Sequence, residues 1–393
     1  MARRSRTPTR GRPLFSTARR MYARTVVAPS GTASRAAVIH IPVVQLNVPS
    51  AWRVGRVTFQ PGGWLASHTQ PEPASGDEPL KVFLQHARKG IEEHHTSTAW
   101  VRVRWPEKNT QPKVDAAVED VRDSVAVLRL YQHARYPTMN TDVQQFGVHG
   151  DIGATMQTYA VTQGERILAH GMHWLGVIGN WDFTAADVRA FRADERFRYL
   201  DATLRTRPGS RNEFQKRVLT AVRTLALATP MLREQLRVVM LATALEALLA
   251  ADVQPGGRSE PGEFFRISQR ASYLLCGEPD QRYPTRPPCP YLTAKNYKAL
   301  SHELDGRSKR GEQPVCSYFW HIFDLFDDRN AALHRTREHF DRSRLSWHRI
   351  FTEKVILYAV DWANAHPGVG LAGLQAELDV FVNGGRAITG AQP

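Results

Sequence analysis

The residues best suited to chemistry lie close together in the stretch Asp328-Arg329-Asn330-Ala331-Ala332-Leu333-His334. Arg329 carries a permanent planar cation that can hold two phosphate oxygens at once. His334 carries the side chain that both accepts and donates a proton near neutral pH. Asn330 can orient either of them. These three side chains predict a site that acts on a phosphodiester.

The spacing of these residues limits how they can meet. In a helix, Asn330 and His334 lie one turn apart on the same face. Arg329 and His334 lie about 140° apart, at about 100° per residue. The pair therefore meets only if Arg329 lies in a distorted first turn or if a second subunit closes the site. Asp327 and Asp328 favour a helix start here, because Asp caps helix N-termini and such an end offers N–H groups to a phosphate.

A carboxylate further upstream is the second notable feature. Glu246 is the only charged residue between positions 238 and 251, in a segment that is otherwise almost entirely apolar. A buried carboxylate without a partner costs several kcal/mol, so we expect an ion pair with Arg270 or Arg266. The alternative is that Glu246 orients the Arg or the His of the motif from behind.

The motif and its surroundings resemble the HEPN superfamily, and the nearest branch is that of the Apea-like HEPN proteins of bacteria. The family's mark is an Arg, four to six residues, and then a His, often with a polar residue after the Arg. The resemblance also rests on the apolar helix Arg237–Leu249, the segment Phe264–Leu275 and the closing helix Ile350–Trp362. It covers about residues 213–366 and does not reach the N-terminal half.

The resemblance implies a four-helix bundle and a homodimer in which two motifs face each other. In catalytic members it implies metal-independent RNA cleavage, in which a 2′-OH attacks its own phosphate and leaves a 2′,3′-cyclic phosphate. His334 would then be the general base or acid, Arg329 would stabilise the developing charge and Asn330 would fix the geometry. Many relatives have Gly after the motif His, whereas this chain has Arg335. Arg335 and Arg337 could contact RNA phosphates.

Such proteins often act in bacterial antiviral defence or stress response, many of them as toxins. Two alternatives stay open. Some HEPN domains do not cleave RNA and only dimerise or bind nucleotides. The chain could instead be a nucleic-acid-binding regulator that uses an Arg-rich arm.

That arm comprises residues 1–36, which hold nine Arg, no Lys and no acidic residue. Without it, the net charge of +14 falls to +5, with 43 basic against 38 acidic residues. Its composition cannot bury a core, so we expect a disordered arm, or a true translation start at Met21. The other interpretation is a tail that attracts RNA without sequence preference.

Composition narrows the remaining classes. A chain of 393 residues can hold two domains. No apolar run approaches the roughly 20 residues that span a bilayer, and the N-terminus lacks the apolar core of a secretory signal. Three cysteines fit a reducing cytoplasm. The pair His170 and His173 has no third ligand at a useful spacing, so we expect no metal and no cofactor.

The expected fold class is an α+β N-terminal domain followed by an all-α HEPN-like helical bundle. The first domain spans residues 37–204, the bundle 213–366 and a tail 367–393, with the linker at Arg205–Ser210. Period-two alternation and apolar stripes predict the elements. Strands are expected at Val38–Leu46, Val54–Phe59, Val101–Trp105, Met156–Val161 and Arg166–Trp174, and helices at Val114–Leu128, Glu213–Leu227, Met231–Ala251, Ser317–Phe326 and Ser343–Ala365.

Two further expectations concern the N-terminal half. Thr184 and Asp187 are spaced as a capping box that opens a helix. The half has no phosphate-binding loop and no nucleophile elbow, so its own residues leave its role unknown. In the defence setting that the HEPN resemblance implies, it would be a sensor or target-recognition module that responds to a nucleotide or a phage-derived trigger.

Overall fold

The computed structural model describes most of the chain between residues 36 and 377. The described residues are 36–61, 97–104, 111–136, 146–148, 156–163, 166–174, 181–228, 233–250, 263–275, 291, 294, 297–311, 317–334, 339–370, 373–374 and 376–377. The predicted Arg-rich arm, apart from Ala36, lies outside them.

The N-terminal half combines a sheet with one long helix and two short ones. Its elements are β1 (Ala36–Val44), β2 (Leu46–Asn47), β3 (Trp52–Val54), β4 (Val57–Gln60), β5 (Ser97–Arg104), α3 (Gln111–Arg135), β6 (Gly147–Val148), β7 (Met156–Gln163), β8 (Arg166–Trp174), β9 (Trp181–Asp182), α4 (Ala185–Ala193) and α5 (Glu195–Arg205). Strands β3-β4-β5-β1-β6 form one sheet in that order, with antiparallel pairing throughout. Ile41 pairs with Ala99, and both are buried on the face that α3 covers.

The segment Val54–Phe59, expected as one strand, is instead the tip of a hairpin. β3 ends at Val54, β4 begins at Val57, and Gly55 between them has a φ of +60°. A side chain there would place its Cβ 2.5 Å from Cβ of Leu204, so glycine fits both the backbone angle and the space. The prediction was wrong because alternation alone does not reveal a two-residue turn.

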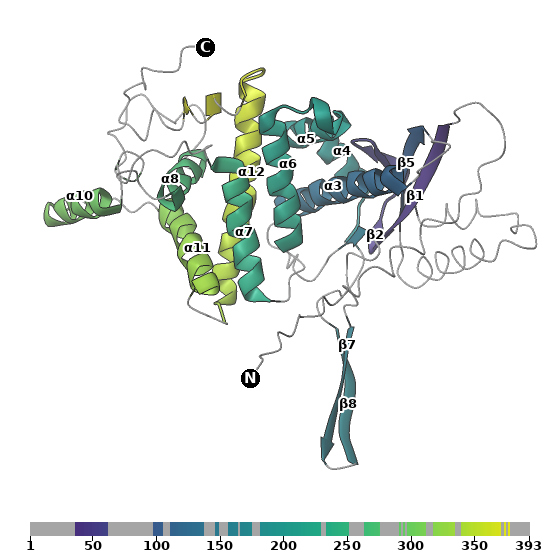
Figure 1. The fold of residues 1–393 in the computed structure, drawn as a ribbon, viewed down its shortest axis with the longest axis horizontal. Helices are drawn as coiled ribbons and strands as arrows, with labels where there is room; N and C mark the ends of the chain where they lie inside the picture. Colours follow the sequence, from purple (N-terminus) through teal and green to yellow (C-terminus); the bar gives the residue numbers. More distant parts are fainter. Residues whose placement is uncertain are drawn as a thin grey trace, which may run out of the picture.

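Helix α3 lies between the sheet and the helical part of the molecule (Figure 1). Of the stripe predicted for this helix, Val121, Val125 and Leu128 are buried, whereas Val114 and Val118 are only partly buried. Burial also extends to every residue from 123 to 133, since α5 and α6 cover the other side of the helix. The capping box at α4 is confirmed, because the Thr184 hydroxyl accepts from the Asp187 N–H and the Asp187 carboxylate accepts from the Thr184 N–H.

From residue 213 onward, the regular structure in the described part of the chain is helical. Its helices are α6 (Glu213–Ala228), α7 (Glu234–Leu249), α8 (Glu263–Leu275), α10 (Tyr297–Lys309), α11 (Ser317–His334) and α12 (Arg342–Ala365). α7 packs against α6, α8, α11 and α12 and is the central helix of the group (Figure 1). The prediction of a helical C-terminal part is confirmed, including the apolar helix around Glu246.

The two halves share one continuous apolar core. A single cluster of buried residues extends from Ile41 in β1 to Leu374 beyond α12. Between α5 and α6, the expected linker forms a short 3-10 turn at Pro208–Ser210. The division into two domains at this point stays a prediction, and the halves pack directly through α3 and α6.

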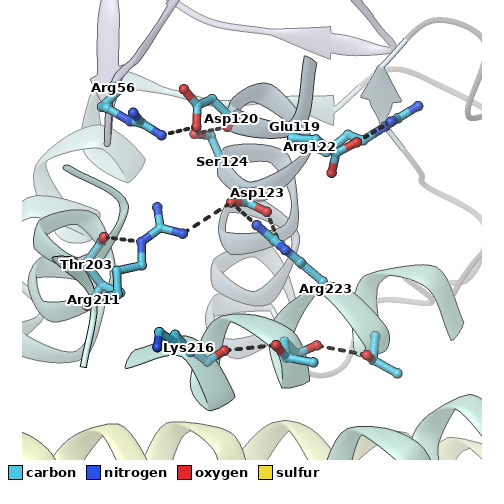
Figure 2. Close-up of polar contacts among 12 residues, drawn as sticks. Arg56, Glu119, Asp120, Arg122, Asp123, Ser124, Thr203, Arg211, Lys216 and Arg223 are labelled. Atoms are coloured by element: carbon cyan, nitrogen blue, oxygen red, sulfur yellow. Dashed lines mark hydrogen bonds and ion pairs between the residues drawn. The ribbon is translucent and has the colours of Figure 1, made fainter. Parts of the chain in front are cut away.

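A network of charged side chains reinforces the same junction (Figure 2). Asp123 of α3 is buried, accepts hydrogen bonds from Arg223 of α6 and lies 4.0 Å from Nη1 of Arg211. Arg56, in the β3–β4 turn, pairs with Asp120 one turn earlier on α3. The hairpin, α3 and the start of the bundle are thereby joined by buried and half-buried ion pairs.

None of the described helices combines the length and the apolarity that a bilayer crossing requires.

Candidate functional site

Helix α11 carries the whole Arg-Asn-His motif in its last two turns. We expected the helix to end at Phe326, with a turn and a new helix start at Asp327 and Asp328. Instead α11 runs unbroken from Ser317 to His334. The expectation was wrong because Asp328 does not cap a helix: its carboxylate bonds to α12. No helix N-terminus is therefore available to a phosphate at this point.

Arg329 points toward α7 and α8. Its Nη2 lies 3.6 Å from Oε1 of Glu246, and its Nη1 donates to the side-chain oxygen of Asn330 at 3.2 Å. The guanidinium also lies over the ring of Phe264, with 5.0 Å from Cζ to the centroid. Only 22% of the side chain is exposed. Three neighbours thus fix the orientation of the cation.

His334 has a different setting. It is the last residue of α11 and is exposed to solvent. Because the helix is continuous, His334 and Asn330 share a face, whereas Arg329 is turned about 140° away. A single chain therefore offers an accessible imidazole and a nearby, largely covered guanidinium that do not face each other.

Glu246 and Arg270 occupy different depths of the bundle. The Glu246 side chain is 25% exposed, so it is less deeply buried than expected, and it pairs with Arg329. Arg270 is 2% exposed and its Nη1 donates to the carbonyl of Leu249 at 2.6 Å, at the C-terminal end of α7. The contact between Glu246 and Arg329 is one of the two roles that we considered for the carboxylate. The expected pair of Glu246 with Arg270 stays a prediction.

Arg335 and Arg337, the expected phosphate contacts, lie outside the described residues.

Comparison of the chain with protein-family models, with curated proteins and with solved structures found no match. The candidate site therefore stands on its own geometry.

Sequence reasoning missed a buried cluster at the seam between α11 and α12. Asp328 is fully buried, and its Oδ2 accepts from Nε2 of His348 at 2.9 Å and from Nε of Arg344 at 2.5 Å. Burial raises the pKa of Asp328, but the His348 hydrogen bond and the Arg344 charge outweigh it, so the pKa lies below its ordinary value. The carboxylate directly before Arg329 therefore stays charged at neutral pH.

The signal for this cluster is only partly present in the sequence. Arg344 and His348 are four residues apart, which places them on one helix face. That spacing does not say which carboxylate they meet, because the answer depends on how α11 and α12 pack. The consequence is a rigid anchor for the helical turn that carries the motif.

A second buried pair lies deeper in the molecule, between α3 and α12. Nδ1 of His133 is 2.5 Å from Oε1 of Glu353, and Nε of Arg349 is 3.7 Å from the same oxygen. All three side chains are at most 10% exposed. These contacts join the two helices.

Among the residues that the structure describes, no three His, Cys, Asp or Glu side chains gather in a way that could hold a metal ion.

Proposed function

We propose that this protein is a metal-independent endoribonuclease with a HEPN-like C-terminal bundle. One observation carries the proposal. In the last two turns of α11, Arg329 is held by Glu246 of α7, and His334 is exposed to solvent. A guanidinium held in place by a carboxylate and an aromatic ring is preorganised, and preorganised cations stabilise charge that develops in a transition state.

The proposed reaction is an internal transfer at one phosphodiester. A basic imidazole removes the proton of the 2′-OH, and the resulting oxygen attacks the adjacent phosphorus. The bond to the 5′-oxygen breaks, and that oxygen takes a proton from a general acid. The products are a 2′,3′-cyclic phosphate and a 5′-OH end. His334 supplies the proton transfer and Arg329 balances the charge on the phosphoryl oxygens.

A homodimer completes the proposed site. Within one chain, Arg329 and His334 point about 140° apart around α11, so one RNA phosphate cannot contact both. Two copies that meet at the ends of α11 would bring Arg329 of one chain toward His334 of the other. We place the activity in bacterial defence or stress response and in the cytoplasm, with the α+β half as the module that senses a trigger or selects the target.

A second candidate is a non-catalytic HEPN-like protein that dimerises or binds nucleotides. One observation favours it: Arg329 already has Glu246, Asn330 and Phe264 as partners, and little of it is exposed. The first candidate requires that a phosphate reach this guanidinium beside Glu246.

The deciding experiment is cleavage of single-stranded or looped RNA in the presence of EDTA, with DNA of the same sequence as a control. We expect cleavage of RNA alone, since DNA lacks the attacking hydroxyl. His334→Ala and Arg329→Ala should each abolish cleavage while the circular dichroism spectrum stays unchanged. Arg329→Lys should remain badly impaired, because an ammonium cannot reproduce the bidentate guanidinium. Full activity of the His334→Ala protein would exclude this site.

A further inference from the structure

Two aromatic side chains with a cation at each end lie along one face of α12. Arg344, Trp347, Phe351 and Lys354 follow each other at spacings of three, four and three residues, which places them on one face of the helix. Trp347 is 49% exposed, although it is among the largest apolar side chains of the protein. Phe351 is only 5% exposed, so the exposed aromatic surface between the two cations is that of Trp347.

The two rings are arranged as a stack. The planes of Trp347 and Phe351 differ by 22°, with centroids 5.7 Å apart, and His321 from α11 lies over Phe351 at 4.7 Å and 24°. Trp347 is also nearly parallel to His321, with an interplanar angle of 25°. Phe351 is additionally covered by the edge of Tyr318. The three nearly parallel rings of His321, Trp347 and Phe351 thus form one group with centroids 4.7 to 6.0 Å apart, and Trp347 is its exposed member.

An exposed lysine and an ion-paired arginine border the rings. Lys354 is exposed, and its Nζ lies 5.9 Å from the centroid of the Phe351 ring. At the other end, Arg344 is 36% exposed while it is held by Asp328 and lies near Asp324. Burial lowers the pKa of His321, so its imidazole is neutral at pH 7 and stacks as an uncharged ring. Cations interleaved with stacked aromatic rings are typical of surfaces that bind single-stranded nucleic acids.

We propose that Trp347, stacked on Phe351 and His321 and flanked by Arg344 and Lys354, is a platform for a base of single-stranded RNA. This inference rests on the proposed function and adds a substrate-binding position to it. His321 and Arg329 are eight residues apart on α11, which is about 12 Å along the helix axis. A strand whose base lies on Trp347 could therefore reach the motif within a short distance.

The platform is tested by equilibrium binding in the His334→Ala background, which prevents cleavage during the measurement. The probes are a short unstructured RNA and an oligomer of the same length and charge with abasic positions. We expect Trp347→Ala to weaken RNA binding about tenfold and to leave the abasic oligomer unaffected, since stacking contributes roughly 1–3 kcal/mol per base. Trp347→Phe should retain most of the affinity. Leu227→Ala, which removes another exposed apolar side chain on α6, is the matched control.

The outcomes separate the platform from the ribonuclease activity when cleavage by the unsubstituted protein is measured alongside. If Trp347→Ala does not change the RNA affinity of the His334→Ala protein, the platform is overturned. The ribonuclease proposal still holds in that case if the unsubstituted protein cuts RNA in EDTA. A tenfold loss without any cleavage supports the platform and rejects the catalytic proposal. A parent protein that binds neither probe overturns both.

Discussion

The Nε2 atom of His348 lies 2.9 Å from the Oδ2 atom of Asp328, and each side chain is only 1% exposed. This contact joins α12 to the helical turn of α11 that begins the motif. Asp328 thus faces α12, while Arg329, the next residue, points toward α7 and α8. The candidate catalytic cation directly follows a residue that plays no part in the proposed chemistry.

Removal of this anchor should destabilise the fold. Asp328→Ala leaves His348 and Arg344 without their shared acceptor, and we expect a loss of about 2–4 kcal/mol in the free energy of unfolding. Asp327→Ala is the matched control, because Asp327 is exposed on the same turn and an exposed carboxylate contributes at most about 1 kcal/mol. Urea unfolding of the two variants measures the difference. Equal losses would contradict the assignment of Asp328 as the anchor.

His321 should make stability depend on pH in mildly acidic solution. Burial holds its pKa below the ordinary value of 6.5, so the unfolded chain binds this proton more readily than the folded protein does. The stability that the neutral ring contributes is present above pH 6.5 and is lost as the pH falls through the lower folded-state pKa. Urea midpoints of the unsubstituted protein and of His321→Phe between pH 7.5 and 5 should diverge, and the variant should show the flatter profile.

The Asp123 network should behave as a buried ion cluster. Asp123→Ala removes the nearest counter-charge of the buried Arg211, and we expect a loss of about 3–5 kcal/mol in the free energy of unfolding. Replacement of both residues, as in Asp123→Ala with Arg211→Met, should recover part of that loss because no charge is then stranded. Thermal unfolding of the single and double variants completes the cycle. A double variant no more stable than Asp123→Ala would show that the stranded charge of Arg211 is not the main cause of the loss.

Glu246 should act on catalysis more than on stability. Because the ion pair with Arg329 is partly exposed, Glu246→Gln should cost only about 1 kcal/mol of stability. If Glu246 positions Arg329, the same variant should lower kcat of RNA cleavage about tenfold with little change in KM. A rise in KM at constant kcat would instead indicate a role in binding RNA.

Mixing two inactive proteins tests whether the site is composite. If each site takes Arg329 from one chain and His334 from the other, heterodimers of Arg329→Ala and His334→Ala regain one intact site. Cleavage in EDTA should then return to at most a quarter of the parent rate in an equal mixture, since half of the dimers are mixed and each holds one of two sites. Continued inactivity of the mixture would place both residues in the same chain's site.

Much of the local structure was determined by the sequence alone. The apolar spacing in α3 and the nearly uncharged run around Glu246 predicted helices that the structure contains. An apolar stripe is typical of a helix that packs on one side, and an apolar run is typical of a helix that is buried all round. The Thr184–Asp187 capping box was equally readable, since both of its hydrogen bonds lie within four residues. The residue types of the motif predict phosphodiester chemistry, which stays a prediction, and they did not predict the geometry of the motif.

The tertiary structure decided which side chains meet. Arg329 and Glu246 are 83 positions apart, and their contact requires that α7 and α11 pack with one particular rotation. The same holds for Asp328 and His348, whose pairing turned an expected helix start into the interior of α11. A sequence encodes which helix faces are apolar, but the rotation and the pairing of the helices arise only when all faces are buried together. Contacts between distant residues therefore could not be read from local spacing.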